Sequence, residues 1–335
     1  MPRSVRGAAT VATVSLLSLA SIPCAVVPIL GFLWVMWWLD RYDREPLPLF
    51  LGVFLWGAIG AVGLAIVGSS LLAVPVSIAA PPETAESLSL TFIAPLVEEP
   101  AKALVLLLVV RSRHFDNVTD GFVYGAAAGL GFGMSENLLY FLDAAGTGDP
   151  MTWAVTVAIR TMYSALMHAG ATSLVGAAVG VAKFRRGVSR TALLTLGFVG
   201  AMGMHALWNG LLALAQDGAG GLGLLNFVLF PMEFAALVAV FQLCLLLEHR
   251  VIRRELEDEA ARGTVPAEHV KMLSSYLLRW RRGWLPRGVD HHAYVRLTTT
   301  LALRKSQLAT GRDHDFYLSE ITRLRREVGA VLGRT

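Results

Sequence analysis

Long apolar runs fill the chain up to about residue 247, and short polar segments separate them. A helix needs about 20 predominantly apolar residues to cross a bilayer. Six consecutive runs are long enough, at residues 48–75, 91–110, 119–142, 152–182, 191–215 and 222–247. The pattern therefore predicts an all-α fold, a polytopic membrane helix bundle.

A further apolar run, at about residues 7–39, precedes these six. At about 1.5 Å per residue it is longer than one untilted crossing requires. Pro23 and Pro28 would either divide it into a hairpin or bend one long helix. Seven or eight membrane spans follow, depending on which of the two forms.

The pattern changes after residue 247. Shorter stretches with helical periodicity, at 251–261, 268–280 and 319–331, alternate with glycine and proline breakers. We expect two parts: a membrane-embedded helix bundle over residues 1–247 and a small, mainly helical C-terminal domain over residues 248–335.

Charge follows the same division. Residues 248–335 hold 17 of the 29 Lys and Arg residues but only 11 of the 25 Asp and Glu residues. The linker 183–190 is also basic, and basic loops favour the cytoplasmic side. We therefore expect an integral protein of a bacterial-type plasma membrane with a cytoplasmic C-terminal domain. Its arginines could contact anionic lipids or simply form a solvated surface, and nothing in them indicates nucleic-acid binding.

The composition narrows the class of protein further. The chain of 335 residues is 55% hydrophobic and 16% charged, whereas soluble domains carry about a quarter charged residues. This excludes a disordered chain and an ordinary cytosolic enzyme. Cys24 and Cys244 lie in apolar runs without metal-ligand spacing, and we interpret them as small buried hydrophobic residues.

Ionisable residues nevertheless occur within the apolar runs. Each would cost at least ~2.5–3.5 kcal/mol at the centre of a span. The polar set comprises Glu98, Glu99, Lys102, Glu136, Arg160, His168, His205, Asn209 and Glu233. Because lipid cannot solvate these groups, we expect most of them to face one another or a water-filled interior. Glu233 stands apart from the others, and a structural role is its simplest interpretation.

The first cluster is Glu98-Glu99-Pro100-Ala101-Lys102. Pro100 lacks an N–H group and should kink the helix. Adjacent helical side chains point about 100° apart, so Glu98 and Glu99 cannot aim at the same atom. We expect one carboxylate to activate water and the other to pair with Lys102, which is within reach of both, or to orient a ligand.

The remaining groups fall on three further spans. Glycines recur every four residues from Gly121 to Gly133 and form a ridge of small residues, along which two helices can approach closely. Glu136 lies on nearly the same face, so we expect it to point into this helix contact. Arg160 and His168 share one helical face, and His205 and Asn209 share another.

This set of side chains suits hydrolysis by an activated water. His168, His205 and Glu136 could hold zinc or another divalent metal, which catalytic sites bind through three protein ligands. Alternatively, a glutamate and a histidine could activate water without metal, with Asn209 and His205 stabilising an oxyanion. The sequence leaves both schemes open. It contains no HExxH, GxGD or GxSG motif.

Four segments carry a resemblance to a known family. They are 41–46 (RYDREP), 98–102 (EEPAK), 131–137 (GFGMSEN) and 205–209 (HALWN), in this order along the chain. Together they resemble the PrsW family of intramembrane metalloproteases, which is distantly related to the CAAX prenyl protease and Abi group. The resemblance covers about residues 30–247.

The resemblance implies an all-helical core and endopeptidase activity on membrane-anchored proteins, an anti-sigma factor in the founding bacterial members. It also implies that Glu98 and Glu99 belong to the catalytic motif and that Glu136, His168 and His205 complete the site. Two departures from the CAAX group argue against prenylated substrates. In that group an arginine follows the glutamate pair after three intervening residues, whereas Lys102 follows Glu99 after only two. In addition, Ser164 stands four residues before His168, where the CAAX group has Phe.

We therefore expect an intramembrane endopeptidase. Glu98, or secondly Glu99, would be the general base; Lys102 and Arg160 would keep the carboxylates ionised. A proton- or cation-coupled transporter is the first alternative, because Glu, His and Arg also build proton relays. A non-catalytic membrane scaffold is the second.

Overall fold

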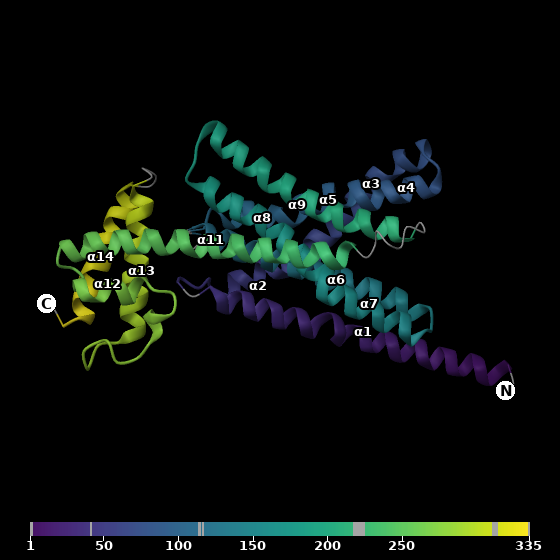
Figure 1. Ribbon diagram of the computed structural model, residues 1–335, viewed down its shortest axis with the longest axis horizontal. Coiled ribbons are helices and arrows are strands. Elements are labelled where there is room, and N and C mark those ends of the chain that lie inside the picture. Colours follow the sequence, from purple (N-terminus) through teal and green to yellow (C-terminus); the bar gives the residue numbers. More distant parts are fainter. Residues whose placement is uncertain are drawn as a thin grey trace. The chain divides into compact units, whose positions relative to one another are not determined.

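The computed structural model describes residues 3–40, 42–112, 115, 117–216, 225–309 and 314–333. None of these residues forms a strand, in agreement with the predicted all-α fold. The helices, drawn in Figure 1, are α1 (Arg3–Leu39), α2 (Leu47–Leu55), η1 (Trp56–Ala61), α3 (Val62–Ala79), α4 (Pro82–Leu88), η2 (Ser89–Ile93), α5 (Ala94–Val109), α6 (Val118–Gly146), α7 (Pro150–Ile159), η3 (Arg160–Ser164), α8 (Ala165–Lys183), α9 (Gly187–Gln216), α11 (Leu225–Ala261), α12 (Ala267–Ser274), η4 (Leu278–Trp280), α13 (His291–Leu308) and α14 (His314–Val331).

Five helices are long and apolar enough to cross a membrane. They cover Val11–Leu39, Leu47–Ala79, Pro150–Lys183, Gly187–Leu214 and Val228–Ala261. The first of them is one continuous helix, with Pro23 and Pro28 inside it, so the hairpin does not form. Helices α5 and α6 form where the sequence predicts helices, but charged residues interrupt their apolar sequences, and neither helix is among these five.

The chain folds into two compact units. The first unit comprises Met1–Leu39 and Glu45–Ala239, and the second comprises Asp40–Arg44 and Val240–Thr335. The link between α1 and α2 is thus shared: Tyr42 belongs to the second unit, whereas Glu45 accepts a hydrogen bond from Tyr124 of α6 at 2.5 Å. Arg41, which begins the first of the four motif segments, lies outside the described residues.

Helix α6 forms the centre of the first unit and is almost entirely buried over its first four turns. It begins at Asn117, whose side chain accepts hydrogen bonds from the backbone N–H groups of Thr119 and Asp120, a capping box. Its glycine ridge lies directly on α8. A Cβ atom at Gly121, Gly125 or Gly129 would overlap backbone atoms of α8, so only glycine permits this approach.

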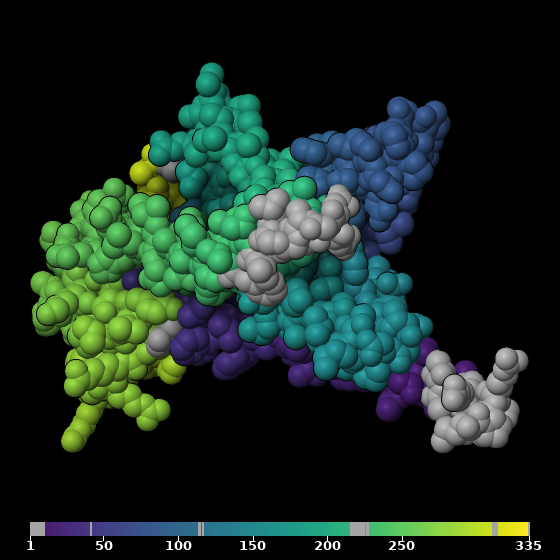
Figure 2. All heavy atoms as spheres, turned by 45° about the vertical axis from the view of Figure 1, so that its right-hand side comes forward, coloured from purple at the N-terminus to yellow at the C-terminus, as the bar shows by residue number. Residues whose placement is uncertain are grey.

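Three helical stretches of the first unit contain a π-helical segment: η1, η2 and η3. Such segments insert a residue into the helix and often occur at functional sites. In this chain η3 carries Arg160, and η2 supplies the carbonyl of Leu90 to a hydrogen bond from Asn209. The hairpin of α3 and α4, coloured blue, stands out from the rest of the first unit (Figures 1 and 2).

The second unit packs α13 and α14 around a small core of buried side chains such as Leu301 and Leu324. Glu259, at the end of α11, is fully buried and receives Lys305 and Arg325, both at 2.7 Å. Helices therefore form most of the tail, in agreement with the periodicity of its sequence.

Candidate active site

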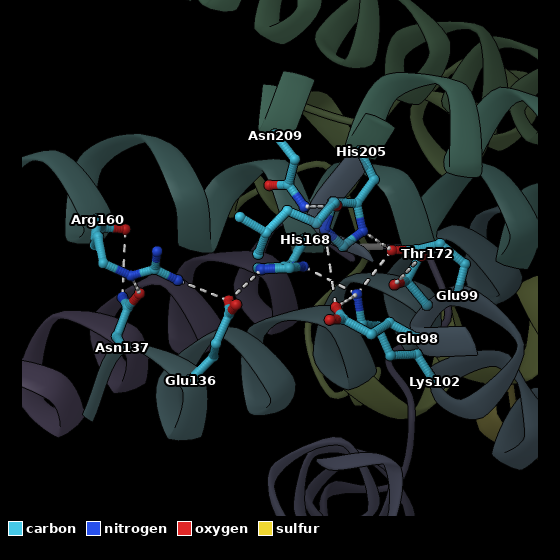
Figure 3. Close-up of polar contacts among 11 residues, drawn as sticks. Glu98, Glu99, Lys102, Glu136, Asn137, Arg160, His168, Thr172, His205 and Asn209 are labelled. Atoms are coloured by element: carbon cyan, nitrogen blue, oxygen red, sulfur yellow. Dashed lines mark hydrogen bonds and ion pairs between the residues drawn. The ribbon is translucent and has the colours of Figure 1, made fainter. Parts of the chain in front are cut away.

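Helix α5 brings the paired carboxylates into the middle of the first unit. Pro100 lies inside this helix, and Trp56 of η1 donates its indole N–H to the neighbouring carbonyl of Ala101 at 3.0 Å. Glu98 and Glu99 point in different directions, as expected for adjacent helical residues (Figure 3). Glu99 is completely buried, whereas 12% of the Glu98 side chain is exposed.

Glu99 is held from three sides. Its Oε1 accepts the ammonium of Lys102 at 2.7 Å and pairs with Nδ1 of His205 at 2.9 Å. Its Oε2 accepts the hydroxyl of Thr172 at 3.2 Å. With partners from α5, α8 and α9, this carboxylate joins three helices and has little freedom to move.

Glu98 is in a different situation. Its Oε2 lies 3.5 Å from Nζ of Lys102 and 3.8 Å from Nε2 of His205. This buried oxygen has no hydrogen-bond partner among the described residues. Buried carboxylate oxygens are normally hydrogen-bonded, so the Glu98 oxygen is placed to receive a further donor or a cation.

His168 lies between Lys102 and Glu136. Its Nδ1 is 2.9 Å from Nζ of Lys102, and its Nε2 is 2.6 Å from Oε2 of Glu136. An ammonium can only donate and a carboxylate can only accept. The neutral ring therefore accepts at Nδ1 and carries its proton on Nε2.

The same reasoning assigns the proton of His205. Its Nδ1 faces the Glu99 carboxylate at 2.9 Å and must carry a proton, so the neutral ring has its lone pair on Nε2. This lone pair and the unsatisfied oxygen of Glu98 lie 3.8 Å apart. The rings of His168 and His205 meet edge to face, with centroids 4.9 Å apart.

Glu136 is fixed at the other end of the cluster. Arg160 of η3 pairs with it at 2.7 Å and lies over the ring of Tyr140, 3.6 Å from its centroid. Arg160 also donates to the side chain of Asn137 at 3.2 Å. The side chain of Glu136 is 22% exposed, so this end of the cluster is its more open side.

Three groups offer ligand atoms that lie within 4.8 Å of one another: Glu98, His168 and His205. Two imidazoles and one carboxylate form a donor set typical of catalytic zinc, and the unpartnered Glu98 oxygen fits a cation. Glu136, expected as the third ligand, instead contacts His168 and Arg160. His168 would have to exchange one of its two present partners for a metal.

Two expected residues lie outside this cluster. The amide of Asn209 donates to the Leu90 carbonyl at 2.9 Å, so it holds the π-helical segment η2. Glu233 is half-buried on α11, and the described residues form no ion pair with it. Thr172 is a contributor that the sequence analysis missed. Its position four residues after His168, on the same helical face, was the available signal.

The chain is similar to one protein family and to several known proteins. The model of the PrsW family of intramembrane metalloproteases matches residues 45–241, which include every residue of the cluster. The chain is 35% identical to Protease PrsW of Clostridioides difficile (strain 630) over 121 residues, 35% of this chain and 49% of the relative. It is 27% identical to Protease PrsW of Bacillus subtilis (strain 168) over 186 residues, 55% of this chain and 78% of the relative.

A third relative, Protease PrsW of Geobacillus kaustophilus (strain HTA426), is 31% identical over 160 residues, 48% of this chain and 65% of the relative. The match thus spans about half the length of the Clostridioides protein and about two thirds of the Geobacillus protein. No solved structure matches the chain. The distant relationship to the CAAX group stays a prediction. Since the family model covers more than half of the chain, the protein belongs to the PrsW family of intramembrane metalloproteases.

Proposed function

We propose that this protein is an intramembrane endopeptidase that hydrolyses a peptide bond of a membrane-anchored protein. The observation that carries the proposal is the pair of acceptor atoms, Oε2 of Glu98 and Nε2 of His205, 3.8 Å apart in the buried cluster. A water molecule placed between two such acceptors could donate a hydrogen bond to each.

In the proposed reaction, Glu98 takes a proton from this water while the water oxygen bonds to the carbonyl carbon of the substrate. The protonated Glu98 then gives the proton to the leaving amide nitrogen, and the C–N bond breaks. The products are a new carboxyl terminus and a new amine. Glu99 acts as a positioning residue, because it orients His205 and holds the Lys102 ammonium beside Glu98.

In the alternative scheme, Glu98, His168 and His205 would hold a divalent metal ion, and the free Glu98 oxygen and the His205 lone pair would be ligands of that ion instead of acceptors for the water. Such an ion would supply a Lewis acid that polarises the carbonyl of the substrate. Glu136 and Arg160 would then orient His168 from behind, in the way that carboxylates orient metal-binding histidines. Asn209 gives one N–H of its amide to the carbonyl of Leu90, and the second N–H would be the donor to the oxyanion.

The decisive experiment compares Glu98→Gln with Glu83→Gln, an exposed glutamate of α4, in proteoliposomes that contain a membrane-anchored reporter substrate. Glutamine keeps the shape of the side chain but cannot accept the proton. We expect cleavage by Glu98→Gln to fall by at least about 100-fold, the contribution of a general base. Unchanged cleavage would remove Glu98 from the mechanism.

The proposal extends to the setting of the enzyme. The α4–α5 segment and α6 each contain at least 28 helical residues, enough to cross a bilayer, and together with the five apolar helices they would give seven spans. The bundle of residues 1–247 would be the catalytic part, and the basic tail 248–335 would lie in the bacterial cytoplasm. By resemblance to the founding members, the substrate would be an anti-sigma-factor-like membrane protein.

A transporter or a scaffold is less compatible with membership of a protease family. Ion uptake by proteoliposomes that lack any proteolytic activity would favour the transporter. Unchanged function after replacement of His168 by alanine would favour the scaffold.

A further inference from the structure

The second unit contains a cavity of about 640 Å³, which is within the range of about 300–1,000 Å³ of small-molecule sites. Cationic and aromatic side chains dominate its lining: Arg44, Trp280, Arg282, His291, His292 and Arg296. They come from three separate places in the chain, namely the link between α1 and α2, the end of η4 with the turn after it, and α13. The proposed proteolytic activity does not use this cavity.

Chain connectivity places the cavity at the surface of the membrane. One of its walls is formed by residues 42–44. This segment follows α1, which ends at Leu39, and precedes the apolar helix that starts at Leu47. A link this short between two membrane-spanning helices must lie at the level of the lipid headgroups. Aromatic residues such as Trp280 are also favoured at that level.

The charges of the lining favour an anion. Two carboxylates, Asp43 and Asp290, oppose the three arginines. Asp290 is already engaged as the N-cap of α13, where it accepts the N–H of Ala293 at 3.0 Å. Arg282 and Arg296 are exposed, and no ion pair to either is found in the part of the chain that the structure describes.

Guanidinium groups match the geometry of phosphate oxygens and form strong, charge-assisted hydrogen bonds with them. The ring of Trp280 lies 5.2 Å from that of His292 and provides an apolar side for a glycerol or acyl segment. We propose that this cavity binds the phosphate-bearing headgroup of an anionic membrane phospholipid. Binding of this kind would tie the C-terminal unit to the bilayer through a specific site in addition to its general basic character.

The test uses the full-length protein in a neutral detergent. Calorimetric titration with short-chain phosphatidylglycerol is compared with titration by short-chain phosphatidylcholine, and inorganic phosphate serves as a soluble anion. We expect saturable binding of phosphatidylglycerol with one lipid per site and at least about tenfold weaker binding of phosphatidylcholine.

The variant Arg282→Gln/Arg296→Gln removes two charges from the cavity. Its matched control, Arg287→Gln/Arg326→Gln, removes two charges from exposed positions that do not line the cavity. We expect phosphatidylglycerol to bind the first variant about tenfold or more weakly, because two charge-assisted hydrogen bonds are lost, and to bind the control as it binds the unmodified chain.

Three results would overturn the proposal. The first is equal affinity for the two lipids, and the second is an equal loss of affinity in the two variants, which would indicate only general surface charge. The third is binding of inorganic phosphate as tight as that of phosphatidylglycerol, which would assign the cavity to a soluble anion. None of these results bears on proteolysis, so this proposal and the proposed activity can fail separately.

Discussion

Two adjacent glutamates of one helix have different environments in this protein. Glu99 is surrounded by donors from three helices, whereas Glu98 keeps a buried oxygen without a hydrogen bond among the described residues. Because the two side chains are chemically identical, the difference arises only from their position on the helix. We infer that Glu99 maintains the geometry of the site and that Glu98 performs the chemistry.

This division of roles predicts different effects on stability. The change Glu99→Gln would leave the buried ammonium of Lys102 without its closest counter-charge, and breaking a buried pair in this way costs about 3–5 kcal/mol. The change Glu98→Gln removes only a longer contact to Lys102, at 3.5 Å. Thermal unfolding in detergent should show a large decrease in Tm for Glu99→Gln and little change for Glu98→Gln. Equal decreases would contradict the assignment.

At the scale of the residue, the sequence predicted that the ionisable side chains meet and that one glutamate of α5 pairs with Lys102, but not the contacts between distant helices. Arg160 and His168, which helical spacing placed on one face, both contact Glu136. His205 and Asn209, also predicted to share a face, contact different partners, Glu99 and the Leu90 carbonyl. The contact of Lys102 with His168 joins positions 66 residues apart, and no local pattern contains that information. The bond from Asn209 to Leu90 could not be predicted either, because it depends on the π-helical segment η2.

Among the elements, α6 and α8 determine the position of His168. The carbonyl of His168 lies against Gly129, where a Cβ atom would overlap it. The atoms in contact belong to the backbones of α6 and α8, which cannot move aside as a flexible side chain can. The glycine ridge thus fixes the position of His168, although it carries no functional group.

We therefore expect Gly129→Ala to destabilise the protein by about 1–3 kcal/mol through overpacking, and to reduce cleavage by displacing His168. Gly146→Ala, at a position on the same helix with no neighbour within 4 Å, is the matched control. Parallel assays of unfolding and of reporter cleavage measure both effects. The prediction fails if Gly129→Ala behaves like Gly146→Ala.

Hydropathy predicted the helices well but not their continuity. The first apolar run forms a single helix through Pro23 and Pro28, because a proline in an apolar helix can be accommodated by a bend. Helices α5 and α6 are not among the five candidate spans: α5 carries Glu98, Glu99 and Lys102, and α6 carries Asp120, Glu136 and Asp143.

For the whole molecule, the proposed seven spans predict the sides of the loops. If α6 crosses the membrane, Arg111 before it and Thr147 after it lie on opposite sides. Both are exposed, so single cysteines introduced there in a background without Cys24 and Cys244 can be labelled. We expect an impermeant maleimide to label Thr147→Cys on intact cells and Arg111→Cys only after lysis. Labelling of both on intact cells would contradict a crossing by α6.

The molecule as a whole gathers ionisable groups from four segments of its membrane bundle into one cluster. The high cost of such groups in lipid predicted that most of them would meet. Glu98, Glu99 and Lys102 do contact the two histidines, and Glu136 contacts His168. The sequence could not predict that Glu98, rather than Glu136, completes the three-ligand group with the histidines, because that depends on packing between distant helices.

The central claim is that Glu98 and His205 act on the same water molecule. A kinetic double-variant cycle tests this directly, with Glu98→Gln, His205→Asn and the double variant compared for cleavage of the reporter in proteoliposomes. Residues that act as a unit are strongly non-additive. We predict that the double variant is about as slow as the slower single variant. If the two losses in kcat multiply, the residues act independently, and the proposed shared water is contradicted.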